Sequence, residues 1–425
     1  MRVGIDLRGL QTGHEFRGIG MYIRSVVEEL FNHGIDSEHE VSLYFYDSTN
    51  PLERLELPPG ARYKTVTFPN PKQPSEDKTK RDKGLSFIRE IAQNHFRWSP
   101  VPHTRGLDVF LQFDQQLGLP KSPFVKKVLV VHDLIPLVFK RQYLPNPFKM
   151  WRRHDWKMAL KVAALNSRYY RGLSQIKRAD LVLAISEHTK QDLVSMLNIK
   201  AKKIRVVPNG GSHRPAANPT DLKNQTQYAS SETVQEIINR SKTKPYLLFI
   251  GGPEPPRRRL DHLVTAYHIL RAHGTDVQLV LVGKELASSK SIPHSITAKM
   301  VDELSYKDDL HLLGYVSDED VNQLYKHALA FIFPTLYEGF GLPIVEAMEH
   351  DCPVVAYDNS SIPEVTGKAA LLIDPGYETI ITAVQRLLDE PKLTADLKRS
   401  GTNQAKKYSW AASAKKTMAA LNELA

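Results

Sequence analysis

Two glutamates stand in the segment Phe333–Met348, whose sequence is FPTLYEGFGLPIVEAM. Apolar residues lead toward Glu338 and Pro343 suits a helix start, so we expect Glu338 on a loop and Glu346 in the first helical turn. The N–H groups of a helix start bind anions such as phosphate. Carboxylates are stable beside phosphate only if they face hydroxyl groups, so we predict sugar hydroxyls as their partners. Taken singly, Glu346 could be a helix-capping acid and Glu338 a surface residue.

Three arginines, Arg257–Arg259, follow Gly251 and Gly252 shortly after an apolar run. Cations at such a strand end suit a diphosphate leaving group, whose developing charge needs stabilisation in a site without metal. We therefore predict that Arg257 and Arg258 stabilise this group. The alternative is a set of solvent-exposed arginines at a helix start, which the helix dipole disfavours.

A histidine and an aspartate, His132 and Asp133, directly follow the apolar run Val128–Val131. A histidine at a strand end can steady a sugar hydroxyl or shuttle a proton. The alternative is a histidine with a structural role only. Because a second group of site residues occurs later in the chain, we favour a functional role for His132.

Two further motifs suggest cofactors that we do not expect. The Gly18-Ile-Gly20 sequence has Ile23 where the dinucleotide fingerprint has its third glycine, which argues against a nicotinamide or flavin cofactor. Asp318-Glu-Asp320 matches a metal-binding D-x-D pattern. Ser317, however, precedes a helical sequence, so Ser317 and Asp320 are better explained as a capping pair. We predict no metal and no other cofactor.

The elements that position these residues alternate between short apolar strands and longer amphipathic helices. Strands that lack period-two alternation are typical of parallel sheets covered on both faces. The expected strands form two series: 3–6, 41–46, 109–113, 128–131, 181–185 and 204–207, then 246–250, 277–282, 310–313, 330–333, 353–356 and 370–373. We predict an N-terminal domain at 1–212, a linker region at 213–243, a second domain at 244–402, and a helix at 403–425 that packs on the first domain.

The composition fits an ordinary soluble globular protein of two domains. Of its 425 residues, 41% are hydrophobic and 24% are charged. Apolar runs such as Ala328–Phe333 are far shorter than the roughly 18 residues of a membrane-spanning helix. The single cysteine, Cys352, excludes intramolecular disulfides and favours a reducing compartment, so we expect a cytoplasmic protein.

The spacing of Glu338 and Glu346 within EGFGLPIVEAM resembles the signature of the retaining GT4-type glycosyltransferases of GT-B fold. The likeness covers most of the chain, and the HDLIP sequence from His132 is similar to that of bacterial polysaccharide mannosyltransferases. Further matches are Gly18-Ile-Gly20, AISEH at 184–188, VPNG at 207–210, FIGG at 249–252 and IPEV at 362–365. The resemblance implies an α/β protein of two doubly wound Rossmann-like domains facing a cleft.

The resemblance also implies roles for individual residues. Glu338 would contact hydroxyls of the transferred sugar, and Glu346 those of the nucleotide ribose. The remaining donor-side contacts would come from Gly18 near the diphosphate and from the amides of Phe340, Gly341 and Leu342 around the phosphates. His132 would line the cleft near the sugar and the acceptor.

The cation pair departs from the pattern of the family. Gly252 stands where relatives often have an arginine, and Arg258 stands where they have a lysine. Arg257 together with Arg258 is therefore the predicted substitute for that pair.

Positive charge is concentrated in residues 121–180, which hold fourteen Lys or Arg and three Asp. Such a region suits anionic lipid, nucleic acid or a phosphorylated substrate, although a solvated helix face is the alternative. Trp151 and Trp156 lie among cations, so we predict that the segment Lys149–Lys161 binds an anionic membrane surface. The apolar stripe of Leu165, Tyr169, Leu173 and Ile176 is expected to be buried.

The function implied by the resemblance is transfer of a hexose from a nucleotide sugar, with retention, to a saccharide or lipid-linked acceptor in surface polysaccharide biosynthesis. Mannose from GDP-mannose is preferred, and UDP-glucose is the alternative donor. An alternative from another class is a catalytically silent nucleotide- or nucleic-acid-binding protein. Nucleic acid is disfavoured because regularly interleaved stacking aromatics are not apparent. We expect a cytoplasmic enzyme that attaches peripherally to the inner face of the membrane.

Overall fold

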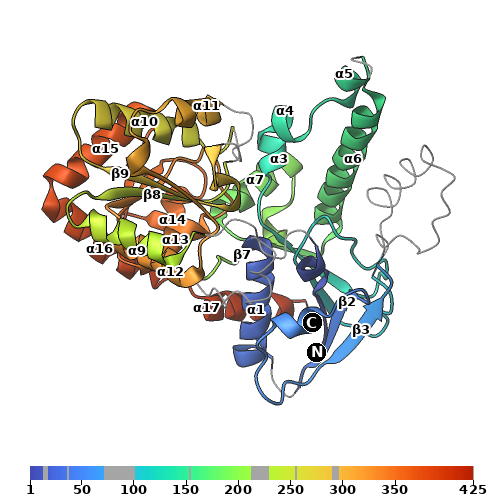
Figure 1. The fold of residues 1–425 in the computed structure, drawn as a ribbon. Helices are drawn as coiled ribbons and strands as arrows, with labels where there is room; N and C mark the ends of the chain where they lie inside the picture. The colour runs from blue at the N-terminus through green and yellow to red at the C-terminus, as the bar shows by residue number, and fades with distance from the viewer. Residues whose placement is uncertain are drawn as a thin grey trace. The chain divides into compact units, whose positions relative to one another are not determined.

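The structure is a computed structural model that describes residues 1–12, 18–35, 38–70, 101–152, 155–211, 229–253, 256–289 and 296–424. The chain forms two compact units (Figure 1). The first unit comprises Met1–Asn209 and Trp410–Ala425, and the second comprises Gly210–Ser409. Of the predicted linker region 213–243, residues 213–228 lie outside the described residues.

The first unit contains a seven-stranded parallel sheet in the order β3-β2-β1-β4-β5-β6-β7. Val3 of the central strand β1 pairs in register with Val41 of β2 and with Val109 of β4. The strands are β1 (Arg2–Asp6), β2 (Glu40–Tyr46), β3 (Lys64–Phe68), β4 (Val109–Gln112), β5 (Lys126–Val131), β6 (Leu181–Ala184) and β7 (Ile204–Val206).

Helices cover the sheet of the first unit, and the last helix of the chain is one of them. These helices are α1 (Gly18–His33), α3 (Ile135–Val138), α4 (Lys140–Tyr143), α5 (Pro147–Trp151), α6 (Trp156–Arg178), α7 (Glu187–Leu197) and α17 (Trp410–Asn422). Helix α17 packs along α1, and the rings of Trp410 and Tyr22 lie 5.6 Å apart. Arg205 and Glu423 add an ion pair of 2.5 Å.

The second unit contains a six-stranded parallel sheet in the order β10-β9-β8-β11-β12-β13. Its strands are β8 (Tyr246–Ile250), β9 (Gln278–Val282), β10 (Leu310–Gly314), β11 (Ala330–Phe333), β12 (Val354–Tyr357) and β13 (Leu371–Ile373). Its helices are α9 (Ser231–Ser241), α10 (Leu260–Ala272), α11 (Ile296–Glu303), α12 (Asp318–His327), α13 (Leu342–Glu349), α14 (Ile362–Thr366), α15 (Tyr377–Asp389) and α16 (Pro391–Ala405).

Both faces of the second sheet are covered, as its continuously apolar strands predict. Helices α10 and α15 pack together on one face, and α13 with α16 and α9 with α12 lie on the other (Figure 1). All five residues of β8 and of β9 are buried. The predicted fold class of two doubly wound α/β domains is therefore confirmed.

Two sequence expectations are wrong in detail. Strand β3 was not expected, because at the sheet edge only Phe68 of its five residues is buried. Leu165 is 45% exposed, whereas the other three members of its predicted stripe are buried. The next residue, Asn166, is partly buried, and its amide donates to the carbonyl of Pro145 at 2.9 Å.

No helix in the described part of the chain is both long enough and apolar enough to span a membrane.

A partly buried histidine in the second unit makes stability depend on pH. His311 on β10 donates through Nε2 to Oε1 of Gln278 on β9, at 3.0 Å. Burial and, to a smaller extent, the charge of Arg240 lower the pKa of His311 to about 4, while Asp309 opposes the shift. The unfolded chain protonates His311 near pH 6.5, so protons favour the unfolded state between about pH 6.5 and 4.

We predict that acid destabilises the wild type more than His311→Gln, which keeps a donor for Gln278 but cannot titrate. Between pH 7 and pH 4.5 the difference should reach up to about 2 kcal/mol, reduced by solvent screening of the ring. Midpoints of urea unfolding measure it. The exposed His273→Gln is the control and should follow the wild type; equal acid sensitivity of His311→Gln would contradict the prediction.

Candidate functional site

The order of the strands marks one place in each sheet where ligands bind in doubly wound folds. The chain begins at a central strand, runs to one edge, and then returns to the other side of that strand. These reversals lie between β1 and β4 in the first unit and between β8 and β11 in the second. Ligands occupy the carboxyl ends of the strands at such points. In the second unit, Gly252 follows β8 and Glu338 follows β11.

Two arginines and one glutamate meet at this point of the second unit. Nη1 of Arg257 pairs with Oε1 of Glu338, and Nη2 of Arg258 lies 3.4 Å from the same oxygen. The side chain of Arg257 is only 4% exposed, against 16% for Arg258 and 13% for Glu338. Two cations thus converge on one carboxylate and leave a net positive charge.

Backbone contacts hold the loops of this cluster together. The N–H of Leu336 donates to the carbonyl of Arg257 at 2.8 Å, and the N–H of Arg259 donates to that of Pro334 at 2.7 Å. Arg258 and Thr335 form an isolated antiparallel bridge between these contacts. The positions of the arginines and of Glu338 are therefore coupled through the main chain.

Gly251, the first of the two glycines after β8, allows Arg258 to approach the sheet. Gly251 has a φ of 141°, and a Cβ at this position would lie 2.4 Å from Nη1 of Arg258. The same nitrogen donates to the carbonyl of Gly252 at 3.2 Å. Gly252, predicted to contact the donor, thus lies beside Arg258.

Three polar residues that were not predicted hold the Glu338 loop. The N–H of Glu338 donates to Oγ of Ser360 at 3.0 Å, and Oγ of Ser361 donates to the carbonyl of Glu338 at 2.9 Å. Asn359 donates through its amide to the carbonyl of Thr335. Ser360 has a left-handed φ of 49°, a strain of about 1 to 3 kcal/mol. The sequence does contain a signal for this loop, because the turn-forming residues Asp-Asn-Ser-Ser at 358–361 stand between a strand and a helix start.

Helix α13 begins beside this loop. Gly341 has a φ of 98° and precedes the first helical residue, Leu342. Phe340 is buried, its ring packs against Tyr408, and its carbonyl accepts a hydrogen bond from Ser361 at 3.1 Å. The N–H groups from Phe340 to Leu342 thus lie at a helix start, where such groups can bind phosphate.

Glu346 lies deeper than expected. Because α13 begins at Leu342, Glu346 is in the second turn, and the expectation of the first turn is wrong. The helix begins before Pro343, since proline is tolerated at either of the first positions. Glu346 is 2% exposed, and the hydroxyl of Tyr325 donates to its Oε2 at 3.4 Å. The carboxylate of Glu346 is therefore almost fully removed from solvent.

His132 lies in the first unit at the end of β5 and is held there. Its Nε2 lies 3.0 Å from the carbonyl of Phe113, which follows β4. A carbonyl only accepts, so Nε2 carries a proton. The ring of Tyr22 packs edge-on at 5.0 Å. His132 is therefore held at the end of β5, next to the strand β4 that borders the reversal point of this sheet.

Gly18 is the exposed first residue of α1. The predicted residues thus fall into two sets: Gly18 and His132 in the first unit, the other eight in the second. In the second unit Arg257, Arg258 and Glu338 are in direct contact, with Gly252 beside them. Leu342 and Glu346 lie on α13, and Phe340 and Gly341 directly precede it.

The structure confirms that Ser317 and Asp320 form a capping pair. Oγ of Ser317 accepts from the N–H of Asp320 at 3.1 Å, and Oδ2 of Asp320 accepts from the hydroxyls of Ser317 and Ser231. Within the described ranges, no group of three or more His, Cys, Asp or Glu side chains is arranged to hold a metal ion.

Two family models match this chain in succession. Residues 16–210 match the Glycosyltransferase Family 4 model, and residues 230–404 match the Glycosyl transferases group 1 model. Together the two matches cover most of the chain.

Two sequence relatives transfer mannose according to their names. O-antigen chain mannosyltransferase B of Escherichia coli is 31% identical over 238 residues, which are 55% of this chain and 58% of that protein. MMP alpha-(1->4)-mannosyltransferase of Mycolicibacterium hassiacum is 26% identical over 430 residues, covering 95% of this chain and 93% of that one. The chain therefore spans little more than half of the E. coli relative.

The fold is shared with sucrose-phosphate synthase from Thermosynechococcus elongatus. The two structures superpose with a TM-score of 0.62 at 19% identity, covering 100% of this chain and 99% of the other.

Proposed function

Because the chain belongs to the GT4-type glycosyltransferases of GT-B fold, we propose that it transfers a hexose from a nucleotide sugar to a saccharide or lipid-linked acceptor, with retention. The observation that carries this proposal is the contact of Arg257 and Arg258 with Glu338 at the reversal point of the second sheet. That cluster combines cations for a diphosphate with a carboxylate for sugar hydroxyls. The proposed pathway is surface polysaccharide biosynthesis.

The two arginines have different exposures and therefore different proposed tasks. Arg258 is the more exposed and faces the donor diphosphate, with the amides of Phe340, Gly341 and Leu342. Arg257 is buried and donates to the carbonyl of Tyr337 as well as to Glu338, so it also orients that carboxylate. Its charge adds to the field that stabilises the leaving group.

Charge competition couples donor binding to Glu338. Without a donor, Glu338 neutralises part of the arginine charge. A diphosphate is a stronger partner for arginine than a single carboxylate, so its arrival frees Glu338 to accept from sugar hydroxyls. Glu346 accepts from the ribose hydroxyls in the same proposal.

Transfer proceeds by front-side displacement. The bond between the anomeric carbon and the diphosphate oxygen breaks, and an acceptor hydroxyl oxygen bonds to that carbon on the same face. The proton of the hydroxyl passes to the leaving phosphate. His132 steadies a hydroxyl of the sugar or the acceptor, and Gly18 leaves room for the diphosphate.

The proposed donor is GDP-mannose, supported by the names of the two relatives. UDP-glucose is the alternative donor. We propose that the reaction occurs in the cytoplasm.

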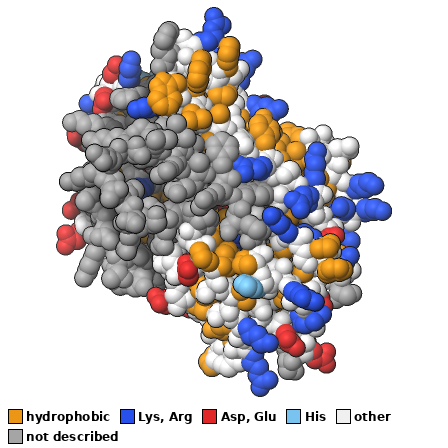
Figure 2. Space-filling view, turned by 90° about the vertical axis from the view of Figure 1, so that its right-hand side faces the viewer, with side chains coloured by type: hydrophobic (Ala, Val, Ile, Leu, Met, Phe, Trp, Pro, Cys, Tyr) orange, Lys and Arg blue, Asp and Glu red, His pale blue; other side chains and the backbone are white. Residues whose placement is uncertain are grey.

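Exposed aromatic residues support peripheral attachment to an anionic membrane. Phe148, Trp151 and Trp156 are 64%, 62% and 43% exposed. Lys and Arg side chains lie among hydrophobic ones in the view of Figure 2. Of the predicted segment Lys149–Lys161, residues 153 and 154 lie outside the described residues.

We predict release of mannose from GDP-mannose, at a higher rate than release of glucose from UDP-glucose, in the presence of excess EDTA. NMR of the product formed on an added acceptor should show the anomeric configuration of the donor. Activity that disappears in EDTA and returns with magnesium would contradict the metal-free assignment, and an inverted product would contradict retention.

Substitution of Glu346 should affect donor binding, whereas substitution of Glu338 should affect turnover. Glu346→Gln should weaken GDP binding by about 1.5 to 3 kcal/mol, because it loses a charge-assisted hydrogen bond. Glu338→Gln should bind GDP at least as tightly as the wild type, because it removes the negative charge that competes with the diphosphate for Arg257 and Arg258. Its kcat should fall. Calorimetry and initial rates measure the two effects. Unchanged GDP affinity in Glu346→Gln would refute its role.

The wild type should sediment with anionic but not neutral liposomes, because cations near such a surface contribute about 1 kcal/mol each. Reversing Arg152 and Lys157 to glutamate should abolish sedimentation. The matched control reverses two exposed cations elsewhere in the first unit, Arg105 and Lys202, with the same change in net charge. Equal loss in both double variants would show a dependence on net charge alone.

A further inference from the structure

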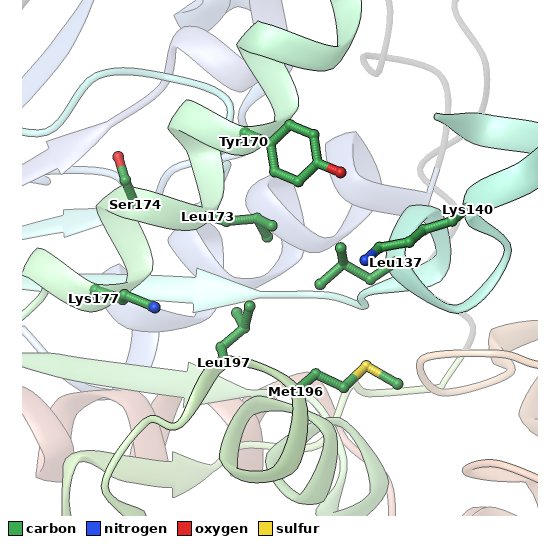
Figure 3. A pocket seen from close by; sticks show the side chains of 8 residues that line it. All are labelled: Leu137, Lys140, Tyr170, Leu173, Ser174, Lys177, Met196 and Leu197. Atoms are coloured by element: carbon green, nitrogen blue, oxygen red, sulfur yellow. The ribbon is translucent and has the colours of Figure 1, made fainter. Parts of the chain in front are cut away.

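A cavity of about 470 Å³ opens on the surface of the first unit. Its residues come from α3 and α4, from the C-terminal half of α6 and from the end of α7 (Figure 3). They are Leu137, Lys140, Tyr170, Leu173, Ser174, Lys177, Met196 and Leu197. The volume lies within the range of small-molecule sites. None of these residues belongs to the site described above.

The floor of the cavity is apolar and is part of the buried core. Leu173 and Leu197 are 6% and 8% exposed and belong to a buried cluster that includes residues of β5 and β6. Met196 and Tyr170 are 45% and 48% exposed and widen the apolar wall toward solvent. A chain of methylene groups would be shielded from water on this floor.

Two ammonium groups flank the floor. Lys140 and Lys177 extend from opposite sides, with Leu173 and Leu197 between them (Figure 3). Among the described residues, neither lysine forms an ion pair with an acid. The nearest helix adds to this charge, since α6 carries six Lys or Arg and no Asp or Glu.

The hydroxyl groups of Tyr170 and Ser174 complete the polar rim. Tyr170, Ser174 and Lys177 are spaced four and three residues apart and share one face of α6. Oγ of Ser174 donates to the carbonyl of Arg171 at 2.7 Å, so toward a ligand it can act as an acceptor.

We propose that this cavity binds an amphiphile with a phosphate head and a single apolar chain. Two lysines match the charge of a phosphate monoester, which is about −1.5 to −2 at neutral pH, better than that of a carboxylate. The apolar floor between the lysines receives the chain. The proposal does not depend on the transfer reaction, and its test uses binding alone.

The test compares four probes below their aggregation concentrations by isothermal titration calorimetry on the full chain. Octyl phosphate should bind with at least tenfold higher affinity than octanoate, octanol or inorganic phosphate. Equal binding of inorganic phosphate would show a plain anion site and overturn the proposal. Equal binding of octanol would overturn the role of the lysines, and failure of octyl phosphate to bind would overturn the site.

Variants locate the binding. The double variant of Lys140→Gln and Lys177→Gln should lower the affinity for octyl phosphate about tenfold, as expected for the loss of two exposed charges. Its control is the double variant of Arg105→Gln and Lys202→Gln, two exposed cations of the first unit outside the cavity, which should bind octyl phosphate as the wild type does.

A second pair tests the apolar wall. Met196→Glu places an acid in the cavity, whereas Met158→Glu makes the same change at a methionine that is also 45% exposed but lies outside it. Only Met196→Glu should lose its affinity for octyl phosphate. Equal loss in Met158→Glu, or unchanged affinity in Met196→Glu with a native circular dichroism spectrum, would overturn the proposal.

Discussion

The buried ion pair of Asp6 and Arg8 organises the ligand edge of the first sheet. Both side chains are 1% exposed, and Arg8 donates to both carboxylate oxygens, at 2.8 and 2.7 Å. Nη2 of Arg8, which bonds Oδ2 of Asp6, also donates to the carbonyl of Gly118 at 2.9 Å. A buried charge that loses its partner costs about 3 to 5 kcal/mol, so this pair fixes the loop after β4 to the end of β1.

The same network reaches the candidate histidine. Nη2 of Arg8 lies 3.4 Å from Oε1 of Gln112, whose amide donates to the carbonyls of Asp114 and Leu117. Phe113, between these residues, offers the carbonyl that accepts from His132. The position of the His132 ring thus depends on a loop that Arg8 holds in place. The second unit uses a different arrangement, in which Arg257 and Arg258 are themselves part of the site.

The sequence predicted an element correctly wherever local residue types are enough to determine it. Continuous apolar runs predicted twelve of the strands, and Ser317 with Asp320 predicted a cap. Strand β3 was not predicted, because an edge strand with one buried residue has no continuous apolar run. The exposure of Leu165 was not predicted because apolar periodicity alone does not show which turns of a long helix other elements cover.

The site was predicted less completely than the fold. The residue types and their strand ends identified Arg257, Arg258 and Glu338, but their direct contact depends on pairing between two loops about eighty residues apart. The support from Asn359, Ser360 and Ser361 comes from a third loop, after β12. Such contacts follow from strand order, which a single sequence does not display.

The position of α17 has a consequence for the order of synthesis. Its residues, Trp410–Asn422, pack in the first unit, although the ribosome makes them after the whole of the second unit. While the second unit can fold from consecutive residues, α1 must wait with an uncovered apolar face, including Tyr22, until α17 emerges. A nascent chain arrested before Trp410 would therefore expose that face to chaperones, however well its second unit had folded.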